Sequence, residues 1–178
     1  MCPLWACAKQ DFCAAYGTTG TSPLIHVAGI TPEADIDMIE RCKRREIVTA
    51  EQLDSTFSVL DQNDTTNVEE KIDWISLGNP HLSLSECDQL VEYLERLEPP
   101  KKKHNDVQVI ACMSRALYDQ STAIPTLLDF GVSFVNDTCW CMLLHPPMIP
   151  DNPNATILTN SGKYVSMNKM YILSKISL

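Results

Sequence analysis

The chain has 178 residues, 44% of them apolar and 21% charged, a composition typical of one globular domain and not of a disordered chain. A formal net charge of −9 and a pI near 4.8 argue against a nucleic-acid-binding surface, because phosphate binding needs clustered Lys and Arg side chains. No apolar run approaches the roughly 20 residues that cross a bilayer, so we expect a soluble protein.

Two helices are predicted in the first third of the chain. Thr31-Pro32-Glu33 has an N-cap Thr, a Pro at the first helical position and a Glu in the first turn, and it predicts a short helix to about Cys42. Thr49-Ala50-Glu51-Gln52 is a capping-box pattern that predicts a second helix to about Leu60. The preceding segment, Asp11 to Gly29, suits a helix or turn packed inside a larger body.

From about residue 68 the pattern changes to strands that alternate with helices. Ser83-Leu84-Ser85-Glu86 is a capping box opening an amphipathic helix to about Leu97, and a helix over 115–130 ends at Gly131 and is kinked or split by Pro125. This alternation implies right-handed βαβ crossovers and a mainly parallel sheet. Strands are predicted over 72–77, 107–112, 132–135 and 155–159.

Polar side chains follow all four predicted strands. Ligands bind beyond the carboxyl ends of the strands of an open α/β sheet, so neighbouring strands would bring an imidazole, a guanidinium, a carboxylate, a thiolate and an ammonium group to one crevice. That mixture suits an anionic substrate beside a thiolate-bound metal. The four loops begin with Gly78-Asn79-Pro80-His81, Ser114-Arg115, Asn136-Asp137-Thr138-Cys139 and Asn160-Ser161-Gly162-Lys163.

Each of these residues also has a purely structural interpretation. His81 fits a turn residue that donates to the backbone as well as it fits a ligand or acid. Ser83 is first a helix cap, a role that is compatible with anion binding at a helix N-terminus. Arg115 and Lys163 fit solvated surface charges as well as anion ligands.

The eight cysteines would permit a disulfide framework, but other features of the sequence argue against both disulfides and a structural zinc site. The N-terminus lacks the basic region, apolar core and cleavage site of a secretory signal, so we expect a reducing compartment and a cytoplasmic protein. Cys139 and Cys141 form a Cys-x-Cys pair, but no second pair at zinc-finger spacing accompanies it. Cys42, Cys87 and Cys112 are interpreted as buried small hydrophobes, and Cys2, Cys7 and Cys13 are too irregularly spaced to indicate a metal site.

Five stretches, in order over about residues 12 to 164, make the sequence similar to the aconitase X family of hydro-lyases. They are His26-Val27-Ala28-Gly29-Ile30-Thr31-Pro32-Glu33-Ala34, Leu77-Gly78-Asn79-Pro80-His81-Leu82-Ser83-Leu84 with Glu86, Ser114-Arg115-Ala116-Leu117-Tyr118, Asn136-Asp137-Thr138-Cys139 and Thr159-Asn160-Ser161-Gly162-Lys163-Tyr164.

The resemblance implies a partial three-layer α/β/α aconitase-like fold with a mainly parallel sheet. It also implies an iron–sulfur cluster held by three cysteines, which acts as a Lewis acid on a substrate hydroxyl, with Cys139 as one metal ligand. Family members dehydrate cis-3-hydroxy-L-proline or, in archaeal relatives, 5-phosphomevalonate. The expected substrate-binding residues are His81, Ser83, Arg115, Ser161 and Lys163, and no catalytic residue is assigned.

The sequence departs from the family pattern at both ends. Family members carry further cluster cysteines before the stretch matched here, and a small swivelling domain, an expected partner, supplies a catalytic serine. After Lys163-Tyr164 the family continues with Ala-His-Tyr, whereas this chain reads Val165-Ser166-Met167-Asn168. We therefore expect a partial catalytic domain over 1–164, with its βαβ core over about 68–164, and a divergent tail over 165–178. One thiolate cannot hold a cluster that needs three, so the isolated chain is expected to be inactive.

Three interpretations of function remain open at this point. The chain is part of a dehydratase of the cis-3-hydroxyproline type, or of the phosphomevalonate type, which is less favoured because no phosphate-cradling Gly-rich loop is evident. Alternatively it is a non-catalytic remnant that binds a small carboxylate or a partner subunit. A thiol or zinc protein that uses Cys139 and Cys141 is the least favoured reading.

Overall fold

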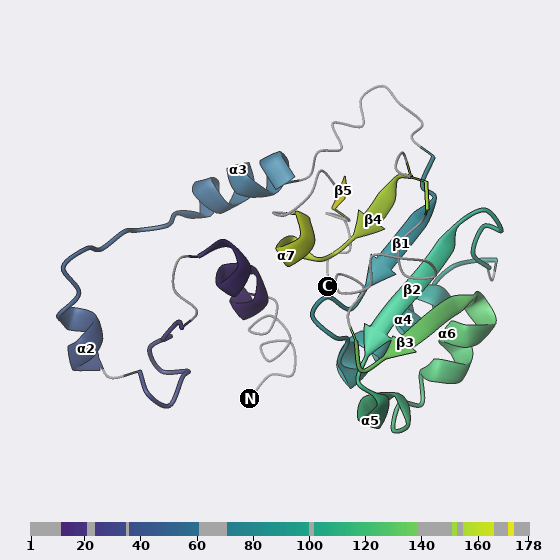
Figure 1. Ribbon diagram of the computed structural model, residues 1–178, viewed down its shortest axis with the longest axis horizontal. Helices are drawn as coiled ribbons and strands as arrows, with labels where there is room; N and C mark the ends of the chain where they lie inside the picture. The colour runs from purple at the N-terminus through teal and green to yellow at the C-terminus, as the bar shows by residue number, and fades with distance from the viewer. Residues whose placement is uncertain are drawn as a thin grey trace.

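A computed structural model describes residues 12–20, 24–34, 36–60, 71–99, 102–138, 151–152, 155–165 and 171–172. Its strands form one parallel sheet with the order β3-β2-β1-β4-β5 (Figure 1). The four predicted strands are all present, with small shifts at their ends, and the predicted α/β class is confirmed. The strands are β1 Trp74–Leu77, β2 Gln108–Met113, β3 Val132–Asn136, β4 Ile157–Thr159 and β5 Tyr171–Ile172.

The helix that follows β1 begins as its sequence predicts. In α4, Leu84–Glu95, the Ser83 hydroxyl accepts the Glu86 N–H, and the Glu86 carboxylate accepts the Ser83 N–H at 2.8 Å. These two bonds satisfy donors that the first turn of a helix otherwise leaves without partners. The apolar side of α4 can therefore pack on the sheet while the capped N–H groups of its first turn keep their hydrogen bonds.

The predicted helix over 115–130 is two helices, α5 Arg115–Tyr118 and α6 Ile124–Phe130. Pro125 lies in the first turn of α6, where its missing N–H removes no helical hydrogen bond. Gly131 closes α6 in the left-handed conformation at φ 111°, which glycine adopts without steric cost. Of the two outcomes expected for the proline, splitting is the one found.

The main core lies between the sheet and the helices α4 and α6, which cover the same face of it (Figure 1). Leu127 of α6 is 1% exposed and packs in this core, so truncation of its side chain should cost about 2–5 kcal/mol. Ile110 and Cys112 of β2 point to the other face of the sheet, with Trp74, Val135 and Ile157 around them. The core is formed by Leu77, Leu82, Cys87, Val109, Ala111, Met113, Ala123, Ile124, Leu127 and Val132.

The N-terminal part of the chain lies apart from the sheet and contains short helices (Figure 1). Residues 12–19 are helical, and α2, Ile36–Glu40, and α3, Ala50–Leu60, follow. The capping box of α3 is confirmed, because the Thr49 N–H bonds to Gln52 Oε1 at 2.9 Å and the Gln52 N–H bonds to Thr49 Oγ1 at 3.3 Å. Of the helices that the structure describes, none has the length and apolar character needed to span a bilayer.

The helix predicted to start at Thr31 is wrong at its beginning. The Thr31 hydroxyl accepts the Val27 N–H at 2.9 Å and donates to the Val27 carbonyl at 3.2 Å. The side chain therefore closes a turn that precedes it and does not cap a helix that follows it. Helix α2 begins only at Ile36.

Residues 171–172 fall within the expected tail over 165–178 and are a strand. Tyr171 and Ile172 form β5 and pair in parallel with Leu158 and Thr159 of β4. A part of the expected tail therefore belongs to the same sheet as the strands of the core.

Candidate functional site

The loops that carry the predicted site residues lie along one edge of the sheet. All the strands are parallel, and β1 pairs with β2 on one side and with β4 on the other. Since β3 pairs with β2, the carboxyl ends of the four predicted strands are neighbours, as expected. The chain runs outward from β1 to β3 and then returns to the opposite side of β1 as β4. The edge between β1 and β4 is thus the switch point at which open α/β sheets form binding crevices.

The loop after β1 is held tightly against β2. Gly78 has φ 83°, and a Cβ atom there would lie 2.1 Å from the Cys112 carbonyl oxygen, so no other residue fits without movement of the backbone. The Leu82 N–H donates to the same carbonyl oxygen at 2.9 Å. Between these two anchors lie Asn79, which is 3% exposed, and His81. The backbone of the loop is therefore fixed from both ends.

His81 connects the β1 loop to the loop after β3. Its Nε2 atom lies 2.9 Å from the Thr138 carbonyl oxygen. A carbonyl oxygen can only accept, so Nε2 carries the proton in this contact. The donation to backbone is the structural role that the sequence left open for His81. It fixes the residue immediately before Cys139.

Asp137 ties the same loop to the start of α5. Its backbone is left-handed at φ 61°, and its N–H donates to the Met113 carbonyl at 3.1 Å. The carboxylate accepts the Arg115 backbone N–H at 2.8 Å and Nε–H at 3.1 Å. The pKa of Asp137 lies below its usual value, chiefly because of the bond from the Arg115 backbone and also because of the Arg115 side chain and His81. Arg115, which was expected to bind substrate, therefore forms an ion pair with a carboxylate of the chain itself.

Ser161 links the loop after β4 to the loop after β1. Its hydroxyl donates to the Asn79 carbonyl oxygen at 2.5 Å, and its N–H donates to Thr159 Oγ1 at 3.2 Å. Ser161 is 3% exposed, and Lys163 follows it in the short helix α7, Gly162–Val165, with a partly buried side chain. These contacts bring two of the matched motifs together at the switch point.

Ser83 is engaged in capping. Besides accepting the Glu86 N–H, its hydroxyl donates to Glu86 Oε2 at 2.6 Å. The carboxylate of Glu86 thus occupies the positive end of α4, where an anionic ligand would otherwise be favoured. The geometry accounts for the structural role of Ser83, while its role in substrate binding stays a prediction.

Two residues of the site were not among the expected substrate-binding residues, although the carboxylate of Asp137 was counted among the groups at the strand ends. Asn79 and Asp137 are polar residues in matched motifs, but nothing local indicates that Asn79 is buried or that Asp137 binds the next helix start. Their partners, Ser161 and Arg115, lie 82 and 22 residues away along the chain. The signal that was available is their place directly after a strand.

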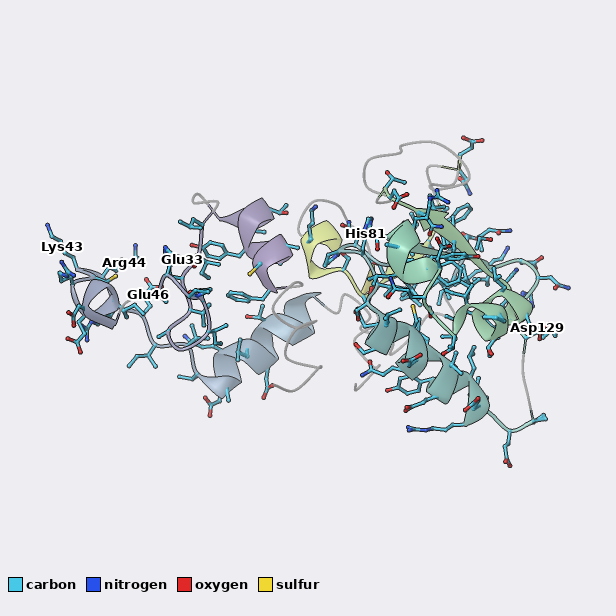
Figure 2. The ribbon with its side chains drawn as sticks, turned by 90° about the horizontal axis from the view of Figure 1, so that it is seen from below. Glu33, Lys43, Arg44, Glu46, His81 and Asp129 are labelled. Carbon is cyan, nitrogen blue, oxygen red and sulfur yellow. The ribbon has the colours of Figure 1, made fainter. Side chains whose placement is uncertain are left out.

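A groove of about 410 Å³ also lies at the far ends of α4 and α6, away from these loops. Figure 2 shows His81 and Asp129, one of the residues lining the groove, on opposite sides of the part that holds the sheet. Its lining is mainly apolar, with one ion pair between Lys102 and Asp129 at 3.3 Å. The groove is therefore separate from the strand-end site.

The family model of the aconitase X third domain matches residues 72–177. The chain belongs to the aconitase X family. It is 38% identical over 160 residues to the cis-3-hydroxy-L-proline dehydratase of Hypocrea jecorina, covering 87% of this chain and 26% of that relative. With the enzyme of the same name from Pseudomonas aeruginosa it shares 38% identity over 165 residues, or 88% of this chain and 27% of the relative.

More distant members of the aconitase X family are also similar. Identity to the phosphomevalonate dehydratase large subunit of Aeropyrum pernix is 30% over 159 residues, covering 88% of this chain and 36% of that subunit. The crystal structure of aconitase X from Thermococcus kodakaraensis in its holo-form matches with a TM-score of 0.64 and 24% identity, over 89% of this chain and 38% of that one. This similarity shows the aconitase X fold. The chain spans about a quarter of the length of the hydroxyproline dehydratases it matches.

The described residues do not by themselves form the metal site that the aconitase X resemblance implies. They contain no group of three or more His, Cys, Asp or Glu side chains able to hold a metal ion. Cys139 lies outside the described residues. Cys87 and Cys112 are fully buried, as expected of small hydrophobes, and burial raises the pKa of the Cys87 thiol to about 11. Cys42 was expected to be buried but is exposed, because it follows the end of α2.

Proposed function

We propose that the chain forms one wall of the substrate pocket of an aconitase X hydro-lyase that dehydrates a small hydroxy acid. The contact between Ser161 and Asn79 carries the proposal, because it joins two motifs of the family at the switch point of the sheet. The identity of 38% to two cis-3-hydroxy-L-proline dehydratases, against 30% to a phosphomevalonate dehydratase subunit, favours cis-3-hydroxy-L-proline as the substrate.

The charges along the edge support an anionic substrate. Lys163, two residues after Ser161, supplies an ammonium group for a substrate carboxylate, and a charged pair of this kind forms strong hydrogen bonds. Arg115 lies further along the edge, where Asp137 already balances part of its charge. We propose that Lys163 attracts the carboxylate because its motif, Asn160-Ser161-Gly162-Lys163, follows β4 at the switch point beside β1, with Ser161 and His81 as further polar residues of the same edge.

We further propose that the enzyme depends on an iron–sulfur cluster to which Cys139 contributes one thiolate. The support is the Asn-Asp-Thr-Cys motif, whose first three residues lie at the carboxyl end of β3. What the chain itself does there is to hold the backbone up to Thr138, through the bonds from His81 and Arg115. Because such a cluster needs three thiolates, the 178-residue chain alone is expected to be inactive and to work with the other parts of the family's enzymes, including the swivelling domain.

A chimeric enzyme tests this function. The 160 residues of the Hypocrea jecorina dehydratase that match this chain are replaced by the matching residues of this chain. We expect the chimera to dehydrate cis-3-hydroxy-L-proline and to leave phosphomevalonate unchanged. A folded chimera with no activity on either compound would favour the non-catalytic interpretation, and activity on phosphomevalonate alone would reverse the assigned substrate.

A further inference from the structure

The side chain of Asn79 has no role in the proposed function, which uses only the carbonyl oxygen of this residue. This residue is 3% exposed, and its Nδ2 atom is buried with no hydrogen-bond partner in the described structure. Buried polar groups are nearly always paired, so each one without a partner calls for an explanation. We propose that the Asn79 amide binds an oxygen of the substrate carboxylate, an assignment whose substrate class rests on the proposed function.

The position of Asn79 in the fold supports this role. It lies directly at the β1–β4 switch point, where its carbonyl oxygen accepts the Ser161 hydroxyl. Other buried polar atoms without partners in the described residues belong to His26 in the N-terminal part, to Trp74 and Ser76 inside β1, and to Asn136, which ends the edge strand β3. Of these residues, Asn79 alone is in a loop between the two strands where the crevice is expected.

The fold prevents Asn79 from relieving its own unpaired state. Gly78 is fixed against the Cys112 carbonyl, and Leu82 donates to that same carbonyl, so the backbone on both sides of Asn79 is held in place. The Ser161 hydroxyl holds the peptide group of Asn79 from the other side. An amide held without a partner is already oriented for a ligand, and binding needs no loss of loop freedom.

The chemistry of the amide fits a carboxylate. Its NH₂ group is a neutral double donor, and a rotation of the amide by half a turn exchanges nitrogen and oxygen without changing its shape. A donor that is neutral adds no charge beside Lys163, which supplies the positive charge for the same ligand. Asn79 thereby contributes direction, and Lys163 contributes electrostatic attraction.

A ligand-pair experiment on the chimeric enzyme tests the inference, because the chimera supplies the other walls of the pocket. L-Proline and L-prolinamide differ only in the carboxylate, and calorimetry or NMR titration measures the affinity of each. We expect the chimera with Asn79 unchanged to prefer L-proline. Asn79→Asp should weaken L-proline binding about tenfold or more, which corresponds to about 1.4 kcal/mol, because a second carboxylate repels the first. L-Prolinamide binding should not fall, and the matched control Asn105→Asp, an exposed position before β2, should change neither affinity.

Asn79→Ala keeps the test decisive if the buried aspartate unfolds the chimera, since alanine removes the amide without adding charge. It should reduce the preference for L-proline over L-prolinamide, although the attraction from Lys163 remains. Absence of saturable L-proline binding by the chimera with Asn79 unchanged, an unchanged preference in both variants, or equal weakening for both ligands would each overturn the inference. If the Asn79 variants lose the preference for L-proline but the chimera does not dehydrate cis-3-hydroxy-L-proline, the proposed function is contradicted and the carboxylate site stands.

Discussion

Replacement of Gly78 by alanine should be among the most damaging single-methyl changes in the chain. The added Cβ would lie 2.1 Å from the Cys112 carbonyl oxygen, in a backbone conformation of φ 83°. The left-handed backbone costs a residue other than glycine roughly 1–2 kcal/mol. Displacement of the loop also breaks the bond from the Leu82 N–H to Cys112, worth about 0.5–1.5 kcal/mol. We therefore expect Gly78→Ala to lower the free energy of unfolding by about 1.5–3.5 kcal/mol.

Urea unfolding followed by circular dichroism measures this free energy, and two other glycines separate its components. Gly29 has φ 71° but nothing within 4 Å of an added Cβ, so Gly29→Ala carries the backbone cost without the clash. Gly17 has neither feature, and Gly17→Ala should leave stability unchanged or slightly improved because it lies in a helix. Equal losses for Gly78→Ala and Gly29→Ala would refute the argument that the loop is fixed against β2.

The core, the carboxylate of Asp137 and the cysteines give further predictions. Leu127→Ala should lower the unfolding free energy by about 2–5 kcal/mol, whereas its neighbour Leu128, 47% exposed, should tolerate alanine with little loss; similar losses would contradict the core assignment. The pKa of Asp137 is lowered in the folded chain, so the stability that its carboxylate contributes is present above the unfolded pKa of about 4 and is lost as pH falls through the folded value. Asp137→Asn should therefore remove part of the acid sensitivity seen in thermal melts. An unchanged pH profile in that variant would refute this prediction. In mass-spectrometric alkylation of the native chain at pH 8, Cys42 should react well before Cys87, whose thiol has a pKa of about 11, and equal rates would contradict the burial of Cys87.

Much of the sheet could be predicted from local sequence patterns. Each strand is a short apolar run, and the capping boxes at Thr49 and Ser83 mark the starts of α3 and α4 where the structure has them. The neighbouring positions of the strand ends follow from the alternation of strands and helices, because parallel crossovers place successive carboxyl ends at one edge.

The details that could not be predicted from the sequence depend on contacts between distant residues, or on which of two local hydrogen bonds a side chain makes. Thr31 has the pattern of a helix cap, but its hydroxyl bonds back to Val27, and the pattern does not distinguish the two choices. The burial of Asn79 and the hydroxyl bond from Ser161 require β4 to lie beside β1. The sequence pattern identifies the polar residues at the strand ends, but it does not predict which of them are in contact.

The most direct test of the central claim is the dehydration rate of cis-3-hydroxy-L-proline by the chimeric enzyme, compared with its Cys139→Ser variant and with the iron content of each. We expect turnover and bound iron in the chimera and a large loss of both in the variant. Turnover and iron content that are unchanged by Cys139→Ser, or a folded chimera without turnover, would contradict it.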